Sequence, residues 1–171
     1  IGIPFCPTRC AYCSFVSESV ERFGEFLPPY LEALLREVEY TGKLLRASGW
    51  HVRTLYMGGG TPTTLSSGQM ARLLEAINTH FDLSRCLEFT VEGGRPDTLD
   101  AEKLRVIKAG GATRISINPQ TVSDTVLRAV GRRHSAAAVA DVFRQAREAG
   151  FDEICGDIML ALPEYTNAEF D

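Results

Sequence analysis

The sequence predicts an α/β fold with a parallel sheet, and three observations lead to that prediction. Short apolar runs alternate with longer stretches whose apolar residues recur at helical spacing. Turns rich in glycine and proline separate the two kinds of segment. No linker or shift in composition divides the chain, so we expect a single domain over residues 1–171. Strands that alternate with helices are typical of parallel sheets that carry helices on one or both faces.

The first half of the chain contains two expected strands and two expected helices. A strand over 1–5 is followed by a helix over about 28–46, which has two prolines in its first turn. A second strand over 52–57 ends at a run of three glycines. Ser66 or Ser67 caps the second helix. The inward face of this helix carries Met70, Leu73, Leu74, Ile77 and Phe81.

The second half predicts three further strands, over 87–91, 113–117 and 154–160. Asp100 caps a short helix that stops at a glycine pair. Two helical segments over 123–130 and 135–149 follow the fourth strand. The chain therefore consists of four β–α units and a fifth strand.

Composition excludes several classes of protein. Of the 171 residues, 44% are hydrophobic and 23% charged, which is typical of a globular chain rather than a disordered one. The net charge of -4 argues against a dedicated nucleic-acid binder. No apolar run reaches the ~18–20 residues that span a bilayer, and no signal peptide is visible, so we expect no membrane partner. Ile1 lies inside an expected strand, and an acidic segment without a helix stop leads to Asp171. We therefore expect a fragment truncated at both ends.

Polar and small residues gather where the expected strands end. Three cysteines follow the first strand, residues 58–62 follow the second, Glu92 follows the third and residues 118–120 follow the fourth. Asp157 lies within the fifth strand among Ile154, Ile158 and Leu160, so we do not expect a purely solvated role for it. Because the carboxyl ends of parallel strands meet at one edge, these features predict a single site.

The five cysteines divide into a cluster of three and two single residues. An odd number of cysteines without a secretory signal favours a reducing compartment, which we take to be the cytoplasm. Cys86 and Cys155 stand in apolar surroundings, and we expect both to be small buried residues in strands.

The clustered cysteines, Cys6, Cys10 and Cys13, have the spacing Cys-x3-Cys-x2-Cys. A structural zinc site uses four ligands, and no second cysteine pair or Cys-His set lies nearby. Three thiolates can hold a [4Fe-4S] cluster and leave one iron open to a ligand. A zinc site completed elsewhere in the chain and a chance grouping remain as alternatives.

The segment CPTRCAYC, with Tyr12 before the third cysteine, resembles the signature of the radical S-adenosylmethionine (SAM) superfamily. The resemblance implies a partial (β/α) barrel with its site at the carboxyl-terminal rim. It also implies that Cys6, Cys10 and Cys13 bind a [4Fe-4S] cluster whose open iron chelates SAM. One-electron reduction, by a donor such as flavodoxin or ferredoxin, would cleave SAM to a 5′-deoxyadenosyl radical.

Further motifs narrow the resemblance to the oxygen-independent coproporphyrinogen III oxidase-like branch, and within it to the coproporphyrinogen dehydrogenase (HemZ) type. They are IGIPFCPTRCAYCSF, YMGGGTPTTL, FTVEGGRPDTL, RISINPQT, VGRRHS and GDIMLALP. The resemblance implies an oxidoreductase of heme biosynthesis that abstracts hydrogen from a propionate side chain of a porphyrinogen. A heme chaperone on the same scaffold and a radical SAM enzyme that modifies RNA are the alternatives.

The same resemblance implies which residues contact the cofactor, and it assigns no catalytic residue. Glu92 would bind the ribose hydroxyls or the amino group of SAM, unless it is only a solvated strand end. Arg132 would pair with the SAM carboxylate, and the motif order favours it over Arg133. The remaining contacts are the backbone of Gly58, Gly59, Gly60 and Thr61, which could also be a simple turn, and the side chains of Tyr12, Gln120 and Asp157.

Three departures distinguish the chain from the pattern of the branch. Gly2 stands where the oxidase and the chaperones usually have histidine, and Ser14 and Phe15 follow Cys13 where the oxidase has a fourth cysteine. Ala161 and Glu164 replace two glycines after the fifth strand, which restricts the backbone there. The missing cysteine counts against coproporphyrinogen decarboxylation by this chain, although members of the HemZ type share these features.

Overall fold

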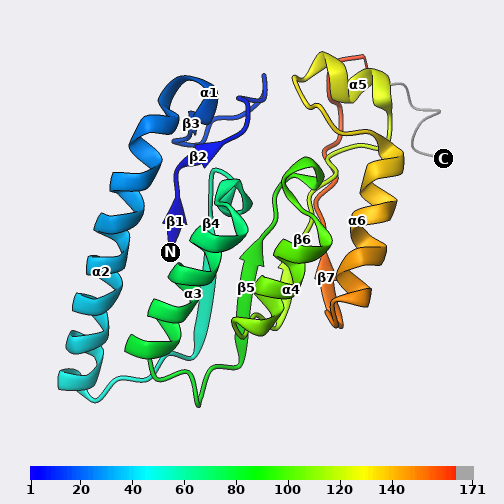
Figure 1. Cartoon of the computed structure of the whole chain (residues 1–171). Helices are drawn as coiled ribbons and strands as arrows, with labels where there is room; N and C mark the ends of the chain where they lie inside the picture. Colours follow the sequence, from blue (N-terminus) through cyan, green and yellow to red (C-terminus); the bar gives the residue numbers. More distant parts are fainter. Residues whose placement is uncertain (165–171) are drawn as a thin grey trace.

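The computed structural model describes residues 1–164 of the chain, so the acidic segment that leads to Asp171 lies outside the described residues. Figure 1 shows strands and helices alternating along most of the chain. The strands are β1 (Gly2–Ile3), β2 (Phe5–Cys6), β3 (Glu18–Ser19), β4 (Thr54–Gly59), β5 (Glu88–Glu92), β6 (Arg114–Ser116) and β7 (Glu153–Cys155). The helices are α1 (Val20–Phe23), α2 (Leu27–Ser48), α3 (Ser67–His80), α4 (Ala101–Ala109), α5 (Asp124–Ala129) and α6 (Ala136–Glu148), with short 3-10 turns at Gly24–Phe26, Pro62–Thr64 and Pro96–Thr98.

The main sheet has five strands in the order β1-β4-β5-β6-β7, and every pairing is parallel. The predicted α/β fold with parallel strands is therefore confirmed. The order of the strands in the sheet follows their order in the chain, so each crossover joins neighbouring strands. All carboxyl ends consequently point to the same rim, which lies at the top of Figure 1.

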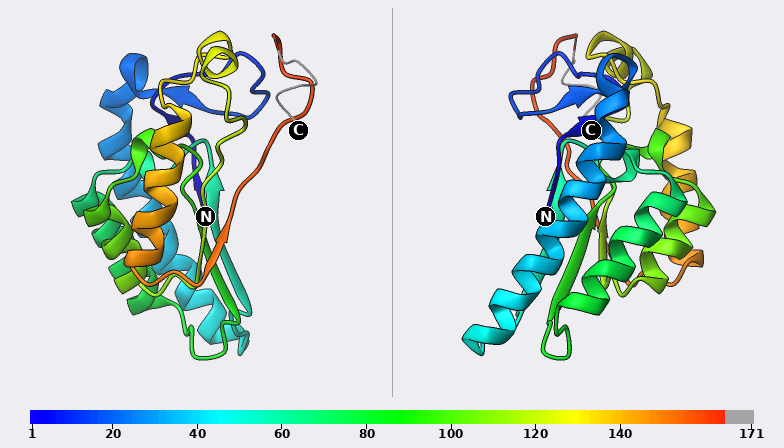
Figure 2. Two further views of the ribbon diagram at one scale, coloured as in Figure 1. Left: turned by 90° about the vertical axis from the view of Figure 1, so that its right-hand side faces the viewer. Right: turned by 60° about the vertical axis from the view of Figure 1, so that its left-hand side comes forward.

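Helices α2, α3, α4 and α6 cover one face of the sheet (Figure 2). Strand residues alternate between this covered face and an open face: Leu55 and Met57 are buried, whereas Tyr56 between them is 54% exposed. The core between sheet and helices includes Ile3, Met57, Val91 and Ile115 from the strands and Leu31, Leu73, Leu104 and Val142 from the helices.

The helices begin and end where their capping residues predict. Ser66, rather than Ser67, caps α3, and it forms a reciprocal capping box with Gln69. Asp100 accepts from the backbone of Lys103 at the start of α4. Gly49 ends α2 in the left-handed conformation with a φ of 67°. No helix within residues 1–164 is long and apolar enough to cross a membrane.

The predicted strand over 1–5 is wrong in one respect, because the chain changes partner at Pro4. Strand β1 pairs with β4, whereas β2 pairs with β3 in a separate two-stranded sheet. Proline has no N–H to donate to a ladder, and the Pro4 carbonyl instead accepts from Glu18 N at 2.8 Å. The small sheet therefore closes the cysteine loop, residues 6–17, at its base.

The predicted fifth strand over 154–160 is also longer than the observed β7, which ends at Cys155. On the neighbouring side Pro119 interrupts the ladder, and Asp157 N bonds to the side chain of Asn118 instead of a backbone carbonyl. A single bridge between Gln120 and Ile158 resumes the pairing. The segment beyond β7 therefore runs along the open edge of the sheet as irregular chain.

Ala161 and Glu164, which follow β7, both adopt a backbone conformation that favours glycine. Ala161 has a φ of 56° and Glu164 a φ of 64°, both in the left-handed region. A residue with a Cβ in this region carries strain of roughly 1 kcal/mol or more. The loop at Ala161 and Glu164 therefore has the left-handed backbone that glycine adopts most easily, although neither residue is glycine.

Candidate functional site

A cavity of about 120 Å³ lies at the rim, between the cysteine loop and the carboxyl ends of β4, β5 and β6. Eleven of the twelve site residues predicted from the sequence line it: Cys6, Cys10, Tyr12, Cys13, Gly59, Gly60, Thr61, Glu92, Gln120, Arg132 and Asp157. Gly58 does not line it. Two larger hollows, of about 650 and 310 Å³, share residues with this cavity and flank the cysteine loop.

The cysteine loop is held by contacts with a segment far along the chain. Ala11 N donates to Val130 O at 3.1 Å, and Thr8 Oγ1 donates to Gly131 O at 3.2 Å. Both acceptors lie at or beyond the end of α5, which Figure 1 places beside the loop at the rim. The thiol of Cys6 is buried 3.3 Å from Thr61 Oγ1, and all five cysteines are free.

Gly60 brings the backbone after β4 into close contact with this loop. Its N–H donates to Ile3 O, and Thr61 N donates to Phe5 O, each at 2.8 Å. A Cβ on Gly60 would lie 2.8 Å from Phe5 O and 3.1 Å from Cys6 Sγ, so only glycine fits without a shift. Strand β4 runs to Gly59, so the prediction that residues 58–62 follow the strand is wrong for its first two residues, which pair with β1.

Glu92 is the last residue of β5 and lies on the open face. Its carboxylate accepts from Tyr56 OH at 3.3 Å and from Asn118 Nδ2 at 3.4 Å, both long bonds. Burial raises the pKa of the Glu92 carboxyl, and the negative charge of Asp157 raises it further, against the hydrogen bond from Tyr56. Burial together with Glu92 raises the pKa of Tyr56 to about 12. Glu92 is thus a half-buried carboxylate with no cation beside it among the described residues.

Replacing Glu92 with glutamine is expected to stabilise the apoprotein at pH 7, because the ionised carboxylate is partly desolvated. The folded-state pKa is raised, so the destabilisation is full above it and vanishes below the unfolded-state pKa. The difference in unfolding free energy between Glu92→Gln and the wild type should therefore shrink as the pH falls. Urea unfolding of the full-length apoprotein at several pH values measures it.

Glu88 supplies the matched control, four residues earlier on the same face of β5. Hydrogen bonds from Thr90 and Arg114 lower the pKa of the Glu88 carboxyl, so its ionised form is favoured. Glu88→Gln should therefore give no gain in stability at pH 7. An equal response of the two variants would show Glu92 to be an ordinary solvated strand end.

Gln120 adopts a φ of 69°, a conformation that non-glycine residues rarely take. Its side chain is buried, and its Oε1 atom has no hydrogen-bond partner among the described residues. A buried acceptor without a donor costs roughly 1–3 kcal/mol. Because the side chain lines the cavity, a ligand donor placed there would satisfy it.

Asp157 is exposed, so the apolar residues beside it in the sequence do not bury its side chain. Its apolar neighbours Ile158 and Leu160 are exposed as well, at 60% and 68%. The strand that would have buried them ends at Cys155, so the chain leaves the core before it reaches Asp157. The residue still lines the cavity from its open side.

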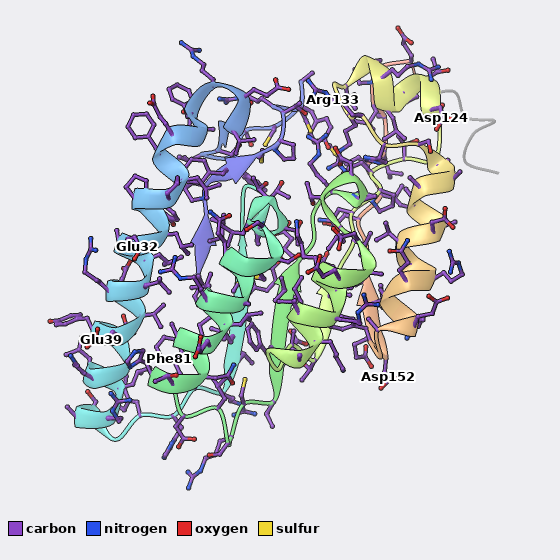
Figure 3. The ribbon with its side chains drawn as sticks, viewed as in Figure 1. Glu32, Glu39, Phe81, Asp124, Arg133 and Asp152 are labelled. Atoms are coloured by element: carbon purple, nitrogen blue, oxygen red, sulfur yellow. The ribbon has the colours of Figure 1, made fainter. Side chains whose placement is uncertain are left out.

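The structure separates the two neighbouring arginines. Arg132 is buried, and it donates through Nη1 to Asn118 O at 2.7 Å and through Nε to Tyr12 OH at 3.1 Å. Burial raises the pKa of Tyr12 to about 12, even with Arg132 beside it. Arg133 points outward and pairs with Glu21 at 2.7 Å; Figure 3 shows it at the rim. Only Arg132 lines the central cavity, as the motif order predicts, and its contact with a cofactor stays a prediction.

The two single cysteines lie outside the cavity, as predicted, but neither is fully buried. Cys86 precedes β5 rather than lying in a strand, and its thiol donates to Glu88 O at 3.3 Å. Cys155 is in β7, where its side chain is on the open face of the sheet. The expectation that both are buried strand residues is therefore wrong, because one precedes its strand and the other faces away from the helices.

Arg95 lines the cavity although it was not predicted at the site, and Asn118, expected at the rim with residues 118–120, lines it as well. Asn118 connects Glu92, Ser116 and the backbone of Asp157 through its side chain. Arg95 carries a buried charge in the sequence Gly-Gly-Arg-Pro-Asp. The one signal in the sequence was a charged residue between glycine and proline at a strand end.

The donor set fits an iron–sulfur cluster. No three His, Cys, Asp or Glu side chains within residues 1–164 converge on a single metal ion. In a [4Fe-4S] cluster each cysteine binds a different iron. The three thiols of the loop therefore do not need to meet at one metal ion. Gln120 Oε1 and the Glu92 carboxylate offer acceptors beside them, which suits a ligand that carries an amino group or hydroxyls.

The family model for the radical SAM superfamily matches residues 1–171. The chain is 38% identical over 171 residues to the oxygen-independent coproporphyrinogen-III oxidase-like protein HemZ of Bacillus subtilis, covering 99% of this chain and 34% of that protein. It is 39% identical over 167 residues to the heme chaperone HemW of the same organism, covering 97% of this chain and 43% of that protein.

Two solved structures are similar in fold. The coproporphyrinogen III oxidase HemN from Escherichia coli matches with a TM-score of 0.87 and 29% identity, over 99% of this chain and 38% of that one. The methyltransferase TsrM from Kitasatospora setae, with cobalamin and a [4Fe-4S] cluster bound, matches with a TM-score of 0.62 and 18% identity over 99% of this chain and 30% of that one, which shows the fold alone. The chain spans roughly a third to two fifths of the length of HemZ, HemW and HemN.

Proposed function

The chain belongs to the radical SAM superfamily, and we propose that Cys6, Cys10 and Cys13 hold a [4Fe-4S] cluster with SAM bound beside it. Members of this superfamily use these two cofactors, so the cofactors predicted from the cysteine motif are confirmed for the family. The observation that carries the assignment of residues is the lining of one cavity by all three thiols and by the orphaned Gln120 Oε1. When bound and reduced, the cluster supplies the electron that cleaves SAM.

The other cavity residues bind and orient SAM in this proposal. The backbone at Gly60 and Thr61 admits a ligand because no Cβ projects from Gly60. Glu92 and Gln120 accept from its amino group or ribose hydroxyls. Arg132 uses Nε and Nη1 to hold Tyr12 and two backbone carbonyls, which orients Nη2 for a carboxylate.

For the reaction, we propose hydrogen abstraction from a propionate side chain of a porphyrinogen in heme biosynthesis. The names of the relatives support a tetrapyrrole, since HemZ and HemN are called coproporphyrinogen oxidases or oxidase-like. In this proposal flavodoxin or ferredoxin supplies the electron, and the protein acts in the cytoplasm because the three thiols must stay reduced. The net charge of -4 argues against an RNA substrate.

A heme chaperone is the second candidate, and two observations favour it. The chain is as similar in sequence to HemW, at 39% identity, as it is to HemZ, at 38%. Ser14 and Phe15 stand where the oxidase has a fourth cysteine, and in this respect the chain resembles the chaperones.

Anaerobic reconstitution of the full-length protein tests the proposal. We expect about four irons per chain, a change in the EPR spectrum of the reduced protein on addition of SAM, and release of 5′-deoxyadenosine in the presence of coproporphyrinogen III. A protein that takes up no iron would contradict the proposed cluster. Stoichiometric binding of heme, with SAM left intact under strong reductant, would favour the chaperone.

A further inference from the structure

Arg95 carries a positive charge into the interior directly behind the cysteine loop. Its side chain is 3% exposed, although arginine is among the residues least often buried. It follows β5 in the turn before the short helix Pro96–Thr98. A buried guanidinium is tolerated when its donors are paired, so its partners show what it holds in place.

The guanidinium of Arg95 has two edges with different partners. Nε and Nη2 each donate to a carboxylate oxygen of Asp97 at 3.1 Å, a bidentate pair. Nη1 donates to Thr8 Oγ1 at 2.7 Å and to Thr8 O at 3.1 Å. The side chain therefore ties the turn after β5 to the cysteine loop, 87 positions earlier in the sequence.

The same Nη1 atom lies 3.9 Å from Cys10 Sγ. Asp97 fixes the guanidinium in this orientation, and His134 Nδ1 lies 3.7 Å from Asp97 Oδ1, the oxygen that also accepts from Arg95 Nε. Burial alone would raise the pKa of the Asp97 carboxyl, but its contacts with His134 and Arg95 hold that pKa well below its usual range. Asp97 is therefore ionised at neutral pH, and the pair stays charged.

We propose that Arg95 is a positioning residue that holds Cys10 in place as a cluster ligand and raises the reduction potential of the bound cluster. The inference rests on the proposed cluster. Reduction adds one negative charge to the cluster, and potentials depend on charge and on hydrogen bonds to the ligating sulfurs. A fixed positive charge at 3.9 Å from one of those sulfurs favours the reduced state.

Redox titration of the reconstituted full-length protein, followed by EPR, tests this role. In Arg95→Gln we expect the ratio of reduced to oxidised cluster at a fixed potential to fall about tenfold, the effect of losing one charge-assisted hydrogen bond; this equals a shift of about 59 mV for one electron. Arg95→Lys keeps the charge and should restore most of the ratio. Arg133→Gln is the matched control, because Arg133 is exposed and pairs with Glu21, and it should leave the potential unchanged.

The outcomes separate this inference from the proposed function. A wild-type protein that takes up no iron would refute the cluster itself. Fully loaded Arg95→Gln with the wild-type potential would refute only the role of Arg95. Should Arg95→Gln fail to fold because the Asp97 carboxylate has lost its bidentate partner, Arg95→Gln/Asp97→Asn removes both charges. The double variant should also shift to a lower potential, because Asp97 binds the edge of the guanidinium that faces away from Cys10. A wild-type potential in the double variant would overturn the inference.

Discussion

Alanine in place of any one of Cys6, Cys10 and Cys13 is expected to leave the full-length protein without a stable iron–sulfur cluster. The three thiolates are one fewer than the four irons of a cubane, so removal of one leaves two irons without a protein ligand. We expect the iron content after anaerobic reconstitution to fall from about four per chain to well below one. Iron and sulfide analysis, together with the visible absorption of the cluster, measures the loss.

Cys86→Ala and Cys155→Ala are the matched controls for this experiment. Both thiols lie outside the cavity, where they bond to the backbone carbonyls of Glu88 and Ile115. These variants should retain the full iron content of the wild type. Loss of iron from either one would mean that the division of the five cysteines is wrong.

The second large effect is expected from Gly60→Ala. The new Cβ would meet Phe5 N at 3.0 Å, Phe5 O at 2.8 Å and Cys6 Sγ at 3.1 Å, and two of these atoms are backbone. Relief of that overlap costs about 1–3 kcal/mol, so the unfolding free energy should fall by this amount. Because the methyl group also occupies the approach to the thiol, we expect SAM to bind about ten- to a hundredfold more weakly. Urea unfolding and equilibrium binding of SAM to the reconstituted protein measure the two effects.

Gly68→Ala is a suitable comparison, because a Cβ on Gly68 would have no atom within 4 Å. Gly68 lies in the first turn of α3, where alanine is favoured over glycine by up to about 1 kcal/mol. This variant should be as stable as the wild type or more so, with unchanged affinity for SAM. Equal losses in Gly60→Ala and Gly68→Ala would show that the close approach at Gly60 has no special role.

The sequence predicted those parts of the fold whose signals are local. Helices α3 and α4 were located by apolar spacing and by the capping residues Ser66 and Asp100, and both caps are present. Strands β4 and β5 are long enough for their apolar residues to be recognised in the sequence as strands. Because the strands of the main sheet are parallel, their carboxyl ends lie at one rim. Eleven of the predicted site residues therefore meet at one cavity.

What the sequence did not predict depends on partners far along the chain. Strands β2 and β3 have two residues each, too few to show a period, and they pair with each other after β1 has ended before Pro4. Asp157 was expected within the fifth strand, but β7 ends at Cys155 and the ladder is interrupted beside it at Pro119. Arg95 resembles a turn residue in sequence, and its inward direction is set by Thr8, 87 positions away.

The long-range contacts of the cysteine loop also bear on how the protein is made. Tyr12 and Arg132, which meet at the rim, are 120 positions apart. At a synthesis rate of about 5–20 residues per second, the loop emerges from the ribosome roughly 6–24 s before the segment that packs against it. Throughout that interval the three thiols are exposed on a nascent chain, where oxidants and stray metal ions can reach them. A cluster inserted during translation would be held by the loop alone, so the geometry favours insertion after α5 and its following turn have been made.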